Sequence, residues 1–273
     1  MQTELAQIIS LTSYGNEFLK TGSLPEKYFP NNSIFQFCNS VDFRDLKKRW
    51  FATHLTETIS AENPLVWFEN LKREGCKKIC LYYKPSTDTT FGPEYNLAGF
   101  SGGAGTWLIE TIFDNYSHYW QKRWQVTNQN AADNKIWSVS YVRNVQKGAT
   151  TNQQLDITSI TIKLKNVLTE LIEFCHKQDL QNWRETFEKA LNMFSKQTPN
   201  KEYYHHDLIL TKNYSLEAQQ LLFAVGESWV FGGMGWWNDM GFENKEVNGN
   251  YLQLSQKLYD LLLQGIIGAT NSN

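Results

Sequence analysis

Apolar residues recur at steps of three and four along the second half of the chain, which is the spacing of one helix face. One such run extends from Ile157 to Cys175, and a second follows it. A third begins after Ser215, whose hydroxyl is suited to cap a helix N-terminus. The last, from about Asn250 to Ile267, ends at Gly268, a residue type common just after helix C-termini. The pattern predicts an antiparallel helical half over residues 155–268.

The first half of the chain contains short strand-like runs separated by turns. Lys77–Lys84 is rich in β-branched and aromatic residues and stops at Pro85, which predicts a strand. Trp120–Thr127 and Lys135–Asn144 are typical of two antiparallel strands joined by a polar loop. The preceding segment, Trp107–Tyr119, fits either a helix or a strand.

Three segments nearer to the N-terminus have helical spacing. Residues 2–12 predict a short helix, and the apolar residues of Phe43–Ile59 also recur at helical steps. Leu65–Glu74 predicts a further helix, with Gly75 as the residue that ends it. We therefore expect an α+β fold, in which a small, mainly antiparallel sheet of about residues 77–145 packs against the helical half.

A length of 273 residues fits one large domain or two small ones. The short stretch between a sheet-containing half, about 1–150, and a helical half, about 155–268, does not have the composition of a linker. We therefore expect a single domain over 1–273 in which both halves share one core. Charged residues at 20%, apolar residues at 41% and aromatic residues at 14% are typical of a soluble globular protein.

Charge and cysteine content exclude several classes of partner. A formal charge of −2 argues against nucleic-acid binding, which requires a basic surface. No apolar run reaches the ~18 residues of a membrane-spanning helix, and the first residues lack the basic start of a secretory signal. The four cysteines have neither a disulfide framework nor the paired spacing of a zinc site. We expect a cytoplasmic protein without membrane contact, metal or cofactor.

The pattern Gly-Gly-x-Gly-x-Trp occurs twice, at Gly102–Trp107 and at Gly232–Trp237. Three glycines within each motif permit positive φ angles and the close approach of another surface. We therefore expect two structurally constrained loops, each with at least one glycine at positive φ. If the two loops converge, they would form the site of a cytoplasmic small-ligand sensor.

The second motif lies in a segment, 229–242, that is richer in Trp, Phe and Met than ordinary loops are. One interpretation is a buried connector between helices; the other is an exposed patch for a protein partner, because these residue types are enriched at interface cores. The predicted binding residues are Gly102, Gly103, Gly105, Trp107, Phe231, Gly232, Gly233, Met234, Gly235, Trp236, Trp237, Asn238 and Asp239.

A weaker signal points to a hydrolase. Gly99–Gly103 matches G-x-S-x-G, the turn that exposes a serine nucleophile between a strand and a helix. Ser101 would be that nucleophile, and His205 or His206 would supply the base. The residues before the motif make a poor buried strand, however, and a pentapeptide alone is a weak match.

The chain combines a slightly acidic charge, many tryptophans and no strong catalytic constellation. These features favour a non-enzymatic protein that binds or inhibits another protein. Bacterial immunity proteins, which neutralise a toxin by binding it, share this profile, although only at the level of composition. The serine hydrolase and the small-ligand sensor remain as alternatives.

Overall fold

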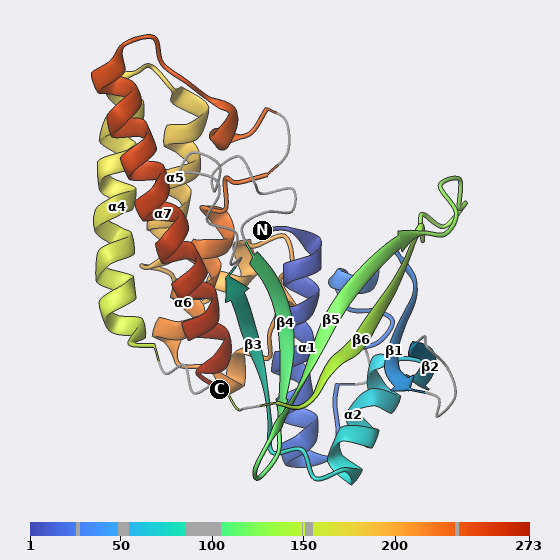
Figure 1. Ribbon diagram of the computed structural model, residues 1–273. Coiled ribbons are helices and arrows are strands. Elements are labelled where there is room, and N and C mark those ends of the chain that lie inside the picture. The colour runs from blue at the N-terminus through green and yellow to red at the C-terminus, as the bar shows by residue number, and fades with distance from the viewer. Residues whose placement is uncertain (26–27, 49–54, 86–104, 149, 151–154, 233–234) are drawn as a thin grey trace.

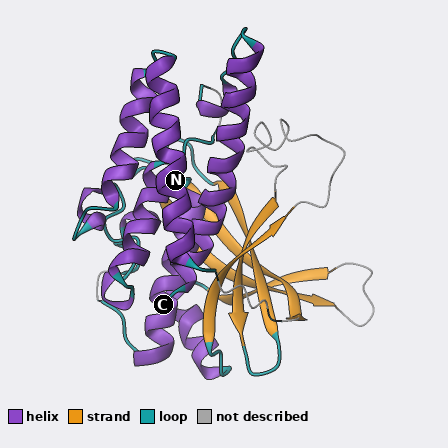
Figure 2. Ribbon diagram, turned by 90° about the vertical axis from the view of Figure 1, so that its left-hand side faces the viewer, coloured by secondary structure: helices purple, strands orange, loops and turns teal. Residues whose placement is uncertain are grey.

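The computed structural model describes the chain apart from residues 26–27, 49–54, 86–104, 149, 151–154 and 233–234. One mixed sheet lies beside a group of C-terminal helices, as Figures 1 and 2 show from two directions. The predicted α+β class is therefore confirmed.

The sheet has six strands in the order β2-β1-β6-β5-β4-β3. Neighbouring strands are antiparallel except β1 and β6, which run parallel. The strands are β1 (Cys38–Lys48), β2 (Leu55–Ala61), β3 (Lys78–Pro85), β4 (Gly105–Ile112), β5 (Ser117–Val126) and β6 (Trp137–Gly148). The sheet therefore begins well before the predicted span of 77–145.

The helix predicted over 43–59 is wrong, because strands β1 and β2 occupy most of this segment and pair with each other. Val41 and Phe43 are buried on one face of β1, whereas Asp42 and Arg44 between and after them are partly exposed. Phe43 stacks on Tyr141 of the neighbouring strand β6 at 5.2 Å between ring centroids. The packing of these side chains on one face of a sheet therefore outweighs the helix-like spacing of the apolar residues.

The other strand predictions are confirmed. The Lys77–Lys84 run is β3, and the two later runs form the antiparallel pair β5 and β6, with Val126 opposite Trp137. The ambiguous segment after Gly105 is strand β4, followed by a turn into β5. Trp124 on β5 and Trp137 on β6 make a T-shaped cross-strand contact at 5.8 Å.

The α-helices of the described residues are α1 (Thr3–Thr21), α2 (Pro64–Arg73), α4 (Ile157–Lys177), α5 (Gln181–Met193), α6 (Leu216–Glu227) and α7 (Lys245–Asn271). Ser215 caps α6 as predicted, because its hydroxyl accepts a hydrogen bond from the Ala218 amide. The expected end of α7 at Gly268 is wrong. Gly268 lies inside the helix, where a Cβ would approach Ile157 to 3.2 Å, so the glycine serves close packing instead.

Helix α1 is longer than predicted and lies between the sheet and the C-terminal helices (Figure 1). Within the latter, α4 packs on α5 and α7, and α6 also packs on α5 and α7. One hydrophobic cluster contains residues of α1, of the sheet and of these helices, for example Ile9, Ile109 and Leu258. The single domain expected from the sequence stays a prediction, although this core crosses the boundary between the halves.

Two asparagines cover the outer edge of β3. The Asn16 side chain accepts from the Ile79 amide and donates to the Ile79 carbonyl, at 2.7 and 2.8 Å. Likewise, the Asn271 side chain accepts from the Leu81 amide and donates to the Leu81 carbonyl, both at 2.8 Å. Side chains of α1 and α7 thus replace a neighbouring strand, which fixes both helices against the sheet and satisfies its edge.

Candidate functional site

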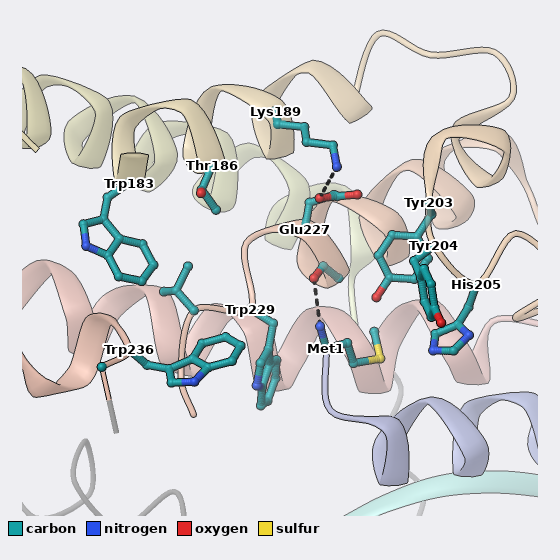
Figure 3. Close-up of a pocket in the computed structure, with 13 residues that line it drawn as sticks. Met1, Trp183, Thr186, Lys189, Tyr203, Tyr204, His205, Glu227, Trp229 and Trp236 are labelled. Atoms are coloured by element: carbon teal, nitrogen blue, oxygen red, sulfur yellow. Dashed lines mark hydrogen bonds and ion pairs between the residues drawn. The ribbon is translucent and has the colours of Figure 1, made fainter. Parts of the chain in front are cut away.

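An open groove with a volume of about 520 Å³ lies among the start of α1, helices α5 and α6, and the segments that flank α6 (Figure 3). Five aromatic side chains contribute to its lining: Trp183, Tyr203, Tyr204, Trp229 and Trp236. Trp236 belongs to the second glycine motif. The size and the aromatic lining are those of a binding site, with polar groups at particular places on its wall.

The two neighbouring tryptophans of the second motif point to different environments. Trp237 is fully buried, and its indole Nε1 donates to the Ser255 hydroxyl at 2.7 Å. Its ring contacts Phe187 on α5 and Tyr251 on α7 at about the same centroid separation, 5.2 and 5.3 Å. Trp237 therefore anchors the loop in the helical core, so the buried-connector interpretation is right for this residue.

Trp236 is 44% exposed and lies at one end of the groove. Its indole covers Gly232 so closely that a Cβ there would come within 2.6 Å of the ring. Gly235, with φ of +85°, turns the chain immediately before Trp236. The interface interpretation of the loop is thus possible for Trp236, because the backbone turns this side chain outward.

Two polar residues that directly follow the motif close this loop. The Asn238 side chain accepts from the Gly232 amide at 3.0 Å, and the Asp239 carboxylate accepts from the Gly235 amide at 2.6 Å. Asn238 also donates to Asp239 at 3.1 Å. Their oxygen atoms are therefore engaged in closing the loop, which holds Trp236 in place. Phe231, the remaining aromatic residue of this set, is fully buried.

The first glycine motif has the expected constraint at its described end. Gly105 has φ of +142°, and a Cβ there would come within 2.7 Å of the Lys84 carbonyl and closer still to Tyr83. Trp107 is buried and contacts the Tyr83 ring at 4.7 Å. With Gly235 in the second motif, the expectation of a positive φ in each motif is confirmed.

A line of aromatic side chains connects the two motifs. Tyr83, which packs on Trp107, has its hydroxyl 3.5 Å from that of Tyr259 on α7. The Tyr259 ring in turn contacts Phe231 at 5.3 Å. The aromatic rings of Tyr83, Tyr259 and Phe231 therefore lie between the two motifs. Among the described residues, the groove includes Gly235 and Trp236 but no residue of the first motif.

The polar end of the groove is built around His205. Its Nδ1 lies 2.8 Å from the Ser33 hydroxyl, and this hydroxyl donates to Asp207 at 2.5 Å. Asp207 also accepts from the Ser33 amide at 2.9 Å. Since the Ser33 proton goes to the carboxylate, Nδ1 of His205 must be the donor in the first contact. Neutral His205 therefore carries its proton on Nδ1, and Nε2 is a hydrogen-bond acceptor.

Burial lowers the pKa of His205 below its ordinary value of 6.5, while the charge of Asp207 partly opposes this effect. The neighbouring His206 is exposed and acts slightly in the same direction as burial. His205 is thus held neutral near pH 7. The arrangement differs from a catalytic triad, because serine stands between histidine and aspartate rather than at the end.

One wall of the groove carries an ion pair between Lys189 of α5 and Glu227 of α6, at 2.9 Å (Figure 3). The nitrogen of Met1 donates to the Gly226 carbonyl at 3.2 Å on the opposite side. Burial raises the pKa of the Tyr203 hydroxyl far above its ordinary value, so it stays protonated. The described charges of the groove are therefore largely balanced.

Several predicted residues lie outside the described part of the chain: Ser101, Gly102, Gly103, Gly233 and Met234. The segment that follows Ser101 bears on the hydrolase alternative, because Gly105–Ile112 is a strand, whereas the nucleophile turn requires a helix there. Of the two candidate bases, His205 is bonded to Ser33 and His206 is exposed.

Within the described ranges, no group of three or more His, Cys, Asp or Glu side chains is placed to hold a metal ion. Among these residues there is also no helix of the length and apolar character needed to cross a membrane. Comparisons with protein-family models, with curated proteins and with solved structures found no match. The groove and its side chains are therefore the basis for a functional proposal.

Sequence reasoning found one end of the groove and missed most of its wall. Trp236 is among the predicted binding residues, whereas His205 is predicted as a base of the hydrolase alternative. Trp183, Tyr203 and Lys189 come from other segments, and their spacing along the chain carries no signal that they meet. The cluster of aromatic and histidine residues at 203–207 was the available hint.

We expect opposite consequences from truncating the two adjacent tryptophans. Trp237→Ala should lower the free energy of unfolding by roughly 3–5 kcal/mol, because it removes a buried ring and leaves a cavity. Trp236→Ala should lower it by less than about 1 kcal/mol, as for exposed positions. Urea denaturation of both variants measures the difference, and equal losses would contradict the assignment of one ring to the core and the other to the groove.

The pKa of His205 predicts a loss of stability in acid. Above about pH 6.5 the imidazole is neutral in both states, but below it the unfolded chain binds a proton more readily than the folded protein. The free energy of unfolding should therefore fall between about pH 6.5 and pH 5. His205→Asn keeps a donor for Ser33 but cannot titrate, so its profile should be flatter, while His206→Asn should retain the wild-type slope. Identical slopes in the two variants would refute this role of His205.

Proposed function

We propose that this protein acts in the cytoplasm by binding another protein at the aromatic groove, without catalysing a reaction and without contacting nucleic acid. The observation that supports the proposal is the exposure of Trp236, at 44%, beside a groove lined by further aromatic side chains. Tryptophan and tyrosine supply much of the energy at protein interfaces, since they bury a large area with few rotatable bonds.

The rigidity of the loop favours this role. Hydrogen bonds from Asn238 and Asp239 fix the glycines around Trp236, and Trp237 anchors the same loop in the core. A side chain that is already held in its binding orientation loses little conformational entropy on association. A narrower form of the proposal is that the protein inhibits a toxin, as bacterial immunity proteins do. Only the composition of the chain supports this narrower form.

The small-ligand sensor is supported less well than protein binding. Its premise was a cleft between the two glycine loops, whereas the described groove involves only the second loop. Within the described residues, buried rings such as Tyr259 fill the space between Trp107 and Phe231. An exposed tryptophan at an open groove suits a partner surface better than an enclosed small molecule.

The test is site-specific photo-crosslinking in the host cell. A benzophenone amino acid in place of Trp236 should give one discrete adduct with a protein partner. The control is the same residue in place of Ile162 on α4, which is 56% exposed and lies outside the groove. Position 162 should not give this adduct.

With the purified partner, Trp236→Ala should weaken binding by roughly tenfold or more, while the stability of the variant stays close to that of the wild type. Ile162→Ala should leave the affinity unchanged. An adduct that forms equally at both positions, or an affinity that does not change with Trp236→Ala, would exclude the groove as the binding site. A toxin-like enzyme as the partner would support the narrower form of the proposal.

A separate prediction distinguishes binding from serine hydrolysis. A broad fluorophosphonate probe should leave the protein unlabelled, because a serine without an activating base and oxyanion donors reacts slowly. Mass spectrometry of the treated protein measures this. Labelling that disappears in Ser101→Ala would establish the hydrolase alternative, and labelling that disappears in Ser33→Ala would show that the Ser33–His205 contact activates the hydroxyl.

A further inference from the structure

Two buried side chains of the groove present polar atoms that no described residue satisfies. Tyr203 and His205 are only 8% and 6% exposed, yet the Tyr203 hydroxyl and His205 Nε2 have no hydrogen-bond partner among the described residues. Nδ1 of His205 is turned to Ser33, which does not line the groove, so the opposite edge of the ring faces the groove. At the wall of a groove, such polar atoms take their hydrogen bonds from water or from a ligand.

The two atoms have complementary chemistry. Tyr203 presents a phenol that remains protonated and can donate, whereas Ser33 and Asp207 make Nε2 of His205 an acceptor. A neutral group with an N–H and a carbonyl satisfies both. The neighbouring Tyr204 hydroxyl is turned to Gln36, whose side chain donates to it at 2.7 Å.

The opposite end of the groove has different chemistry. Figure 3 shows Trp183 and Trp236 at one end, and Tyr203 and His205 at the other, with Trp229 between them. The tryptophan end suits an aromatic or large aliphatic side chain, which gains from stacking and from the burial of apolar area. The groove thus offers separate places for a side chain and for a neutral polar group.

Charge selects against an ionic ligand. The titratable groups around the polar end are Asp207 and His206 on the same segment, Lys189 on α5, Glu227 on α6 and the Met1 nitrogen, whose pKa burial lowers to about 6. Asp207 is engaged with Ser33, and Lys189 is paired with Glu227 at 2.9 Å. His206 is exposed, and the Met1 nitrogen donates to Gly226. A neutral ligand leaves these pairs intact.

We infer that the groove binds an extended peptide segment of the partner. Its aromatic side chain lies against Trp236 and Trp183, and the backbone N–H and carbonyl of one of its residues donate to Nε2 of His205 and accept from the Tyr203 hydroxyl. The inference rests on the proposed protein-binding function and adds the class of ligand to it. Every peptide residue except proline provides one N–H donor and one carbonyl acceptor, and in an extended segment the two point to the same side.

The probe for this inference is N-acetyl-phenylalanine amide, a neutral aromatic residue flanked by two amides. Its fully N-methylated analogue keeps the ring and both carbonyls but cannot donate a hydrogen bond. In protein with ¹⁵N-labelled histidine, NMR first gives the tautomer of His205 and then follows Nε2 during a titration with each compound. The Trp236 indole signal reports the aromatic end.

We expect Nε2 of His205 to be unprotonated in the free protein and to shift when the amide binds, while Nδ1 keeps its proton. The N-methylated analogue should bind roughly fivefold or more weakly, and Tyr203→Phe should weaken the amide by a similar factor. His206→Asn is the matched control that should change neither, because His206 does not line the groove. The tautomer measurement needs no variant, so it stands even if Tyr203→Phe folds poorly.

A proton on Nε2, equal affinity for the two compounds, or no binding of the amide would each overturn the peptide inference. None of these results affects the photo-crosslink at position 236, which tests whether a partner binds at the groove at all. Conversely, amide binding at His205 without a crosslinked partner would separate recognition of a peptide-like ligand from the proposed protein-binding role.

Discussion

Helix α1 has no solvent-facing side over most of its length, because every residue from Leu5 to Gly15 is buried. Its apolar residues belong to the shared core, while two of its buried polar side chains bond to the two halves of the protein. Gln7 accepts from the Tyr141 hydroxyl of β6 at 2.7 Å. Ser13 accepts from the Leu210 amide at 3.0 Å, on the side of the helical half. The sheet and the helices are therefore held together through one buried helix that both must satisfy.

The same helix determines where the polar end of the groove lies. Tyr14 of α1 donates to the Asp207 carbonyl at 2.9 Å, and Asn32 donates to the same oxygen at 2.8 Å. The Asp207 side chain then holds Ser33, and Ser33 orients His205. Each contact is local, but together they fix the His205 ring relative to helix α1. The orientation of His205 is consequently fixed before any ligand binds.

Much of the fold could be predicted from periodicity, since amphipathic helices and alternating strands show which face is buried. The failure at β1 and β2 has a physical cause. Apolar residues recurring at steps of three or four fit a helix face, whereas the strand is selected by long-range pairing with β6 and by packing such as that of Phe43 on Tyr141. The glycine motifs were informative for a different reason. Glycine adopts positive φ more readily than other residues, so the glycines predict this backbone conformation directly, as Gly105 and Gly235 show.

The groove itself could not be predicted, because its residues come from segments that meet only after folding. Composition indicated that the 229–242 loop was unusual, but it could not show which of Trp236 and Trp237 faces outward. A hydrogen bond from Trp237 to Ser255 and the turn at Gly235 decide this. The glycines thus have a positional function: they allow one ring to enter the core while its neighbour lies over Gly232 at the groove. An alanine at position 232 would keep the core anchor and displace only Trp236, which makes the orientation of that ring separable from the stability of the fold.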